Sequence, residues 1–73
     1  MILAERNRLD GRIISVKLGS LVAKVIVQIG DNEIESIVTR QSADEMRLKP
    51  GDPITVVIRS TEVMLSRSAL AGA

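Results

Sequence analysis

A chain of 73 residues is long enough for one small domain, whose core is marginal without further stabilisation. The sequence has no cysteine and no histidine, which excludes disulfides, thiolate chemistry and the usual zinc ligands, so association between copies is the stabilisation that remains. Ten Lys and Arg against nine Asp and Glu give a net charge of +1, and Phe, Tyr and Trp are absent, which argues against a basic, aromatic surface for nucleic acid.

Hydrophobic residues make up 45% of the chain, with a mean hydropathy of +0.21. That content is high for so small a chain and indicates apolar surface shared between subunits. No stretch approaches 18 uninterrupted apolar residues, and no basic segment followed by an apolar run stands at the start. We therefore expect a soluble, cytoplasmic homo-oligomer.

The first half of the chain predicts three antiparallel strands. Residues 1–16 read as an entering strand with a bend or bulge at residues 9–11, after which Ile14 and Val16 share one face. A hairpin turn at residues 17–20 leads to a strand at residues 21–29, whose odd-numbered residues are all apolar and whose other face is only half polar. We expect that second face to meet another subunit. Residues 30–32 then form a hairpin, and residues 33–39 return.

The junction after this strand carries two hydroxyls, Thr39 and Ser42. Ser42 and Glu45 have the S-x-x-E spacing of a capping box, which predicts that a helix starts at Ser42. Residues 49–52 (Lys-Pro-Gly-Asp) predict a type II turn, so the helix lasts about two turns. Unpaired N–H groups beside hydroxyls are suited to an oxyanion, and we interpret the junction as half of an anion pocket. The alternative interpretation is that Ser42 only caps the helix.

The last part of the chain predicts a strand at residues 54–59, an interruption at residues 60–62 and a final regular segment at residues 63–65. Residues 66–73 read as a frayed tail, so the domain spans residues 1–65. Five or six short strands with one short helix favour an all-β fold, a closed or partly closed antiparallel barrel of the OB type.

Five short motifs, taken in order, resemble those of the molbindins, the Mop or TOBE domains. They are Arg6-Asn7-x-Leu9-x-Gly11, Gly19 followed by Val22-Ala23-x-Val25, Ile37-x-Thr39-x-x-Ser42-Ala43, Leu48-x-x-Gly51, and Arg59-Ser60-Thr61-x-Val63-Met64. The resemblance runs from about residue 4 to residue 64. It implies a cytoplasmic protein that binds molybdate or tungstate on a five-stranded, Greek-key, OB-like barrel. It also implies a hexamer, a trimer of dimers with strands exchanged between neighbours and oxyanions held at subunit interfaces.

The resemblance also assigns a set of binding residues. By position they are Arg6, Thr39, Ser42, Arg59 and Ser60, with backbone contacts expected from Ala4, Glu5 and Ala43. Two positions depart from the family pattern, because Ala4 replaces a serine and Arg59 replaces a lysine. Loss of one neutral donor at Ala4 lowers affinity by about two- to tenfold. Taken individually, Arg6 and Arg59 also fit solvated surface cations.

A tetrahedral dianion requires donors only, and hydroxyls with arginine guanidinium groups supply them. We expect no cofactor and no directly bound metal cation. The competing interpretations are a structural or regulatory assembly domain without ligand and, less favoured, an OB-type nucleic-acid binder. Enzymatic activity is the weakest class, because no histidine, cysteine or paired-carboxylate spacing is present.

Overall fold

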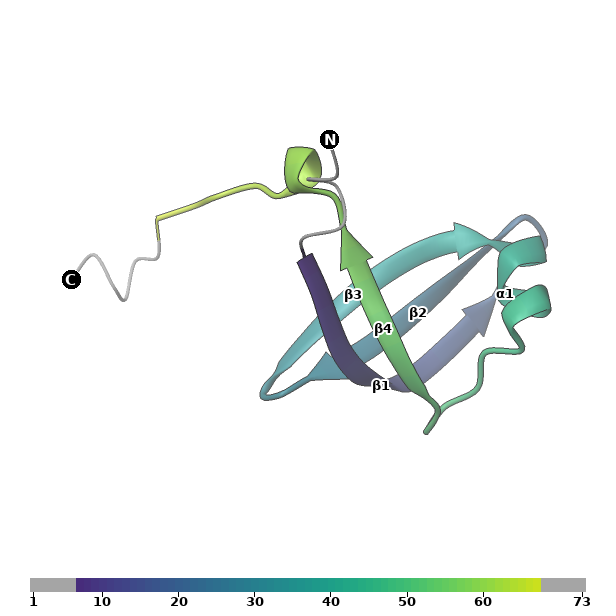
Figure 1. Ribbon diagram of the computed structural model, residues 1–73. Helices are drawn as coiled ribbons and strands as arrows, with labels where there is room; N and C mark the ends of the chain where they lie inside the picture. The colour runs from purple at the N-terminus through teal and green to yellow at the C-terminus, as the bar shows by residue number, and fades with distance from the viewer. Residues whose placement is uncertain (1–6, 68–73) are drawn as a thin grey trace.

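The computed structural model describes residues 7–67, which form one antiparallel sheet, a short helix and a turn of 3-10 helix (Figure 1). The strands are β1 (Asn7–Leu18), β2 (Val22–Ile29), β3 (Asn32–Thr39) and β4 (Pro53–Ile58). Helix α1 (Arg40–Met46) joins β3 to β4, and η2 (Ser60–Glu62) follows β4. The sheet order β3-β2-β1-β4 is that of a Greek key, and the sheet is open, with β3 and β4 at its edges.

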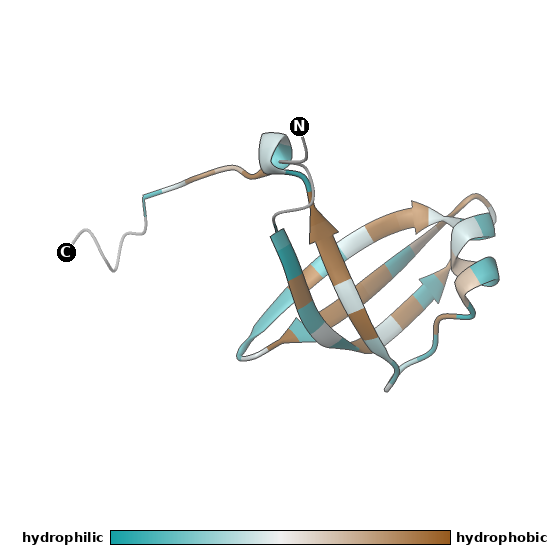
Figure 2. Cartoon of the chain, viewed as in Figure 1, coloured by the Kyte–Doolittle hydropathy of each residue, from teal (hydrophilic) through white to brown (hydrophobic). Residues whose placement is uncertain are grey.

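The predicted class, mostly β with one short helix, is confirmed, but the strand number is wrong for the described part of the chain. Four strands form there, and residues 63–65 follow η2 without joining the sheet. Figure 2 shows these apolar residues on a segment that extends away from the body. Val63, Met64 and Leu65 are 45%, 92% and 93% exposed.

Strand β1 is shared by the two halves of the sheet. Its first half, from Asn7 to Arg12, pairs with β4, and its second half, from Arg12 to Leu18, pairs with β2. Gly11 lies where the strand crosses β2, and a Cβ atom there would come within 2.5 Å of the Gln28 carbonyl oxygen. Glycine is therefore required at this position by the close approach of two backbones.

The irregularity in β1 lies further along the strand than predicted. The register with β2 shifts between Ile13 and Ser15, which marks a bulge rather than a bend at residues 9–11. The extra residue breaks the alternation, so Ile13 is buried, Val16 packs against the same core and Ile14 is 41% exposed. The prediction that Ile14 and Val16 share a face is wrong for this reason.

The core lies on the concave side of the sheet. Ile13, Val25 and Val27 are buried at its centre, and Ala23 and Ala43 are also buried. Around the centre pack six partly buried side chains: Val16, Ile29, Val38, Leu48, Ile54 and Val56. The predicted apolar face of β2 is thus confirmed, except that Leu21 precedes β2 and is 81% exposed. Only small and medium aliphatic side chains fill this core, so each contributes about 1.5–3 kcal/mol at most.

Turn chemistry accounts for both hairpins and for the entry to β4. Gly30 and Asp31 alone connect β2 to β3, and Gly30 has φ +60, as the first central residue of a type II′ turn requires. In the first hairpin the Gly19 N–H donates to the Val22 carbonyl at 2.8 Å. The predicted turn at residues 49–52 is confirmed, because Gly51 has φ +92 and the Asp52 N–H donates to the Lys49 carbonyl.

Several expectations fall on residues 1–6 and 68–73, which lie outside the described residues. They concern Ala4, Glu5, Arg6, the first part of the entering strand and most of the expected tail. Ser66 and Arg67 are exposed and have no regular structure. No helix in residues 7–67 is long and apolar enough to cross a membrane.

The packing at Gly11 predicts that Gly11→Ala destabilises the fold by about 1–3 kcal/mol, because the added methyl group meets a backbone carbonyl that cannot rotate away. The measurement is urea unfolding followed by circular dichroism. Gly30→Ala is the matched control: no atom lies within 4 Å of its Cβ, so only the left-handed conformation is penalised, by about 1 kcal/mol. A Gly11→Ala variant at least as stable as Gly30→Ala would contradict the packing argument.

Candidate anion-binding site

Thr39 is the last residue of β3 and the N-cap of α1. Its backbone is extended (φ −68, ψ 151), and its Oγ1 accepts a hydrogen bond from the Ser42 N–H at 3.0 Å. Threonine suits both roles, because its β-branched side chain favours a strand and its hydroxyl satisfies one of the free N–H groups of the helix. The junction is therefore fixed by one side chain that belongs to both elements.

The helix begins earlier than the capping-box spacing predicted. It spans Arg40–Met46, so Ser42 is its third residue, and the Glu45 carboxylate accepts from Gln41 rather than closing a box with Ser42. The prediction failed because Thr39 and Ser42 are both good caps, and the pairing of Thr39 with Val22 ends β3 at the first of them. About two turns of helix were expected, and the seven residues observed agree with that.

The two hydroxyls of the junction contact each other. Thr39 Oγ1 donates to Ser42 Oγ at 2.9 Å, which leaves the Ser42 hydroxyl proton available to an outside acceptor. Thr39 is exposed and Ser42 is half-buried. Ser42 is therefore the better placed of the two to donate to an anion, while Thr39 orients it.

The backbone N–H groups at the start of α1 are more fully engaged than the sequence suggested. The Arg40 N–H donates to the Leu21 carbonyl at 2.9 Å, and the Ser42 N–H donates to Thr39 Oγ1. Ala43, a predicted backbone contact, is the buried residue of α1. At this junction, the hydrogen-bond donors that remain for an anion are therefore mainly side-chain hydroxyls.

The acidic residues of α1 lie beyond its first turn, and one of them is ion-paired. None lies in the first turn of the helix, and Asp44 forms an ion pair with Arg40, with the Nε to Oδ1 distance at 3.1 Å. Glu45 accepts from Gln41 one turn back. Arg40 is not among the predicted site residues, although its i,i+4 spacing from Asp44 is typical of such a pair.

Arg59 and Ser60 lie at the other end of the sheet. Arg59 precedes η2, has an extended backbone, and accepts through its carbonyl from the Glu62 N–H at 2.9 Å. Both side chains are exposed. The residue before them, Ile58, pairs with Asn7 at the start of β1. The positions assigned to the late part of the site are thus accessible at the open end of the β1–β4 pair.

A single copy of the chain does not bring the two groups of predicted residues together. Thr39 pairs with Val22, beside the C-terminal end of β1, whereas Arg59 follows the pair Ile58 and Asn7 at its N-terminal end. β1 has 12 residues, a path of about 36 Å at 3.3 Å per residue. In Figure 1, α1 and η2 accordingly lie at opposite ends of the sheet. The predicted site residues within residues 7–67 therefore fall into two separate groups, Thr39 with Ser42 and Arg59 with Ser60, which we call half-sites.

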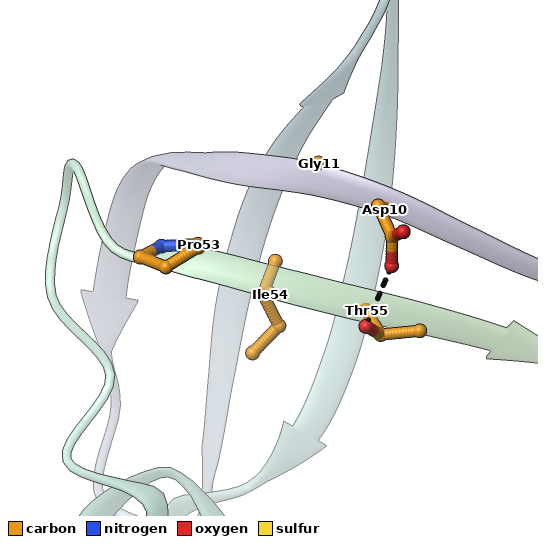
Figure 3. A pocket seen from close by; sticks show the side chains of 5 residues that line it. All are labelled: Asp10, Gly11, Pro53, Ile54 and Thr55. Atoms are coloured by element: carbon orange, nitrogen blue, oxygen red, sulfur yellow. Dashed lines mark hydrogen bonds between the residues drawn. The ribbon is translucent and has the colours of Figure 1, made fainter.

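A shallow open groove of about 380 Å³ lies elsewhere, over β1 and β4. It is lined by Asp10, Gly11, Pro53, Ile54 and Thr55, and Thr55 Oγ1 donates to Asp10 Oδ1 at 2.8 Å (Figure 3). A carboxylate without a cation in the lining repels an oxyanion, so this groove is not part of the candidate site. Within residues 7–67, no cluster of three or more acidic, histidine or cysteine side chains is arranged to hold a metal ion.

Comparison with known proteins identifies the family. Residues 4–65 match the model of the TOBE domain. This chain belongs to the TOBE domain family. Molybdenum-pterin-binding protein 1 of Clostridium pasteurianum is 39% identical over 66 residues, which cover 89% of this TOBE domain chain and 97% of that protein.

Two solved structures share the fold of this TOBE domain. A molybdate-binding protein from Sporomusa ovata matches with a TM-score of 0.84 at 25% identity, over 92% of this chain and 100% of that one. The cytoplasmic molybdate-binding protein ModG matches with a TM-score of 0.73 at 33% identity, over 82% of this chain and 43% of that one. Family membership and the fold both agree with the resemblance found in the sequence motifs.

The cap assignment predicts that Thr39→Ala lowers the free energy of unfolding by about 1 kcal/mol, because the Ser42 N–H loses its acceptor. Thr39→Ser keeps the acceptor and should restore most of the loss. Ser42→Ala removes no cap and should change stability by less than about 0.5 kcal/mol. Chemical denaturation of the three variants measures these differences, and a larger loss for Ser42→Ala than for Thr39→Ala would place the cap at Ser42 after all.

Proposed function

We propose that this protein binds molybdate or tungstate at interfaces between copies of itself and performs no chemistry on the anion. The observation that carries the proposal is the junction of Thr39 and Ser42, whose hydroxyls contact each other and leave the Ser42 hydroxyl proton to donate, in a chain whose relative and structural neighbours are named for binding molybdenum compounds. A tetrahedral dianion accepts hydrogen bonds through every oxygen, so it selects sites that present hydrogen-bond donors.

In this proposal each half-site supplies a different kind of interaction. Ser42 donates a neutral hydrogen bond from a hydroxyl oriented by Thr39, and Ala43 belongs to the same half. Arg59 supplies positive charge with Ser60 beside it, and the sequence motifs add Arg6 and the backbone of Ala4 and Glu5, which lie outside the described residues, to the proposed site. Charge-assisted hydrogen bonds are about twice as strong as neutral ones, so the arginines contribute most of the binding free energy. The hydroxyls mainly set the position of the anion.

The separation of the half-sites supports a site shared between subunits. Because Thr39 and Arg59 lie at opposite ends of β1, the Thr39–Ser42 half of one copy has to meet the Arg59–Ser60 half of another. The open edges at β3 and β4 and the exposed residues 63–65 offer surface for such contacts. We infer a homo-oligomer, a hexamer built as a trimer of dimers, in which an exchanged strand completes an OB-like barrel.

We infer a cytoplasmic location and a role in storage or homeostasis of the oxyanion. The location is supported by ModG, which is described as a cytoplasmic molybdate-binding protein. A binding protein without catalysis serves its role by reversible capture, so release at low free anion concentration is part of the function.

Isothermal titration tests binding directly. Molybdate and tungstate should bind, and sulfate should bind at least about tenfold more weakly, because its smaller tetrahedron leaves the same donors too far apart. Ser42→Ala should weaken molybdate binding by about two- to tenfold, the effect of one neutral hydrogen bond. Ser20→Ala, an exposed hydroxyl in the first hairpin, is the matched control and should bind as the wild type does.

The absence of heat with all three anions, from a folded oligomer, would sink the binding proposal. It would favour instead the assembly domain without ligand, because the fold and the association would then exist without an anion. Equal affinity of Ser42→Ala and wild type would remove Ser42 from the site while leaving the binding function intact.

Sharing of the site between copies can be tested by complementation. Ser42→Ala and Arg59→Gln each damage a different half-site, so each variant alone should bind poorly. Refolding the two together in equal amounts should restore full affinity at about one quarter of the sites, because random assembly places two intact halves together with that frequency. Titration stoichiometry measures the fraction. Recovery of no sites would show that both halves of each site come from the same copy.

A further inference from the structure

Arg40, a half-buried residue at the start of a helix, makes polar contacts on both sides of the junction that it occupies. Its Nε donates to Asp44 Oδ1 and Oδ2 at 3.1 and 3.2 Å, its Nη1 donates to the Gly19 carbonyl at 3.0 Å, and its backbone N–H donates to the Leu21 carbonyl at 2.9 Å. One residue thus binds both sides of the β1–β2 hairpin and one turn of α1. The sequence separation of 21 residues between Arg40 and Gly19 makes this a tertiary contact.

A cation at this position opposes the helix dipole, since positive charge is unfavourable at a helix N-terminus. Here Asp44 offsets that charge across one turn, and the same carboxylate holds the guanidinium plane in place. Because Nε and Nη1 both donate to protein oxygens, the protein itself fixes the orientation of the Arg40 guanidinium.

We propose that Arg40 is a positioning residue, which fixes the hairpin against the start of α1 and so sets the orientation of the Thr39 and Ser42 hydroxyls. This inference rests on the proposed function, because the half-site that it shapes is the neutral half of the anion site. Thr39 is held on one side by its pairing with Val22 and on the other by the neighbouring Arg40, so movement of the hairpin moves Thr39 directly.

Arg40 also removes two acceptors from the vicinity of the site. The carbonyl oxygens of Gly19 and Leu21 carry partial negative charge, and both accept from Arg40. Were the hairpin released, these oxygens would be free to approach the Ser42 hydroxyl and to repel an oxyanion there. Holding them engaged before the ligand arrives is preorganisation, which improves affinity without adding a contact.

The clamp itself can be tested without ligand, by amide hydrogen exchange in the full-length oligomer. In Arg40→Gln the amides of Gly19 and of position 40 should lose protection by about tenfold or more, while those in the centre of β2 stay unchanged. Arg8→Gln removes the same charge from the exposed face of β1 and should change none of them. Unchanged protection at the hairpin in Arg40→Gln would overturn the proposal.

Molybdate titration in about 1 M salt, where the Debye length is about 3 Å, then separates positioning from charge. Arg40→Gln and Arg40→Lys should both bind about tenfold more weakly, because a lysine ammonium cannot span Asp44 and the Gly19 carbonyl at once. Asp44→Asn should also weaken binding, whereas Glu45→Gln, the same charge change on the same helix, should leave it unchanged.

The remaining outcomes each decide the question. Full rescue by lysine, or tighter binding in Asp44→Asn, would identify Arg40 as a direct cationic ligand and overturn the positioning role. An Arg40→Gln variant that loses amide protection at the hairpin but binds molybdate with wild-type affinity would also overturn it. A wild-type protein that binds no molybdate would overturn the proposed function, and the exchange result would still decide whether Arg40 holds the hairpin.

Discussion

The close crossing of β1 over β2 is the constraint on which the rest of the structure depends. β1 can pair with β4 through its first half and with β2 through its second only because Gly11 has no side chain at the crossing and a bulge turns the strand after Ile13. This single bent strand creates the concave face that the core fills. It also sets the two ends at which the half-sites lie, so the geometry of the site follows from that of one strand.

The proposed division of the site matches the physics of a dianion. The neutral hydroxyls of Thr39 and Ser42 and the cation of Arg59 are each a poor site alone, since a neutral pair binds weakly and an isolated cation on a surface is strongly hydrated. Joined between two copies, as proposed, they provide geometry and charge together. An anion held in this way contacts two chains at once, so its binding free energy also stabilises the assembly, and association in turn raises affinity for the anion.

Features set by local chemistry could be predicted from the sequence, and features set by distant contacts could not. The turns at Gly30 and Gly51 follow from backbone conformations that few residues adopt. The helix start at Arg40 and the bulge at Ile13 depend on pairing with β2, which no local pattern encodes. The motifs correctly indicated the family, but the distance between Thr39 and Arg59 became visible only with the strand order. The contact of Arg40 with the first hairpin could not be predicted, because Gly19 is 21 residues away.

Residues 63–65 are an exposed apolar segment, and both edges of the sheet are unpaired. With such surfaces, the state of the protein depends on its concentration. With assembly as proposed, a newly made copy stays incomplete until it meets others, and the rate of that encounter rises steeply with the number of copies in the cell. When synthesis is low, a lone chain is degraded by proteases or pairs its strands with other proteins before it meets another copy. The amount of working protein then rises more than proportionally with synthesis, so a modest change in gene expression produces a large change in binding capacity.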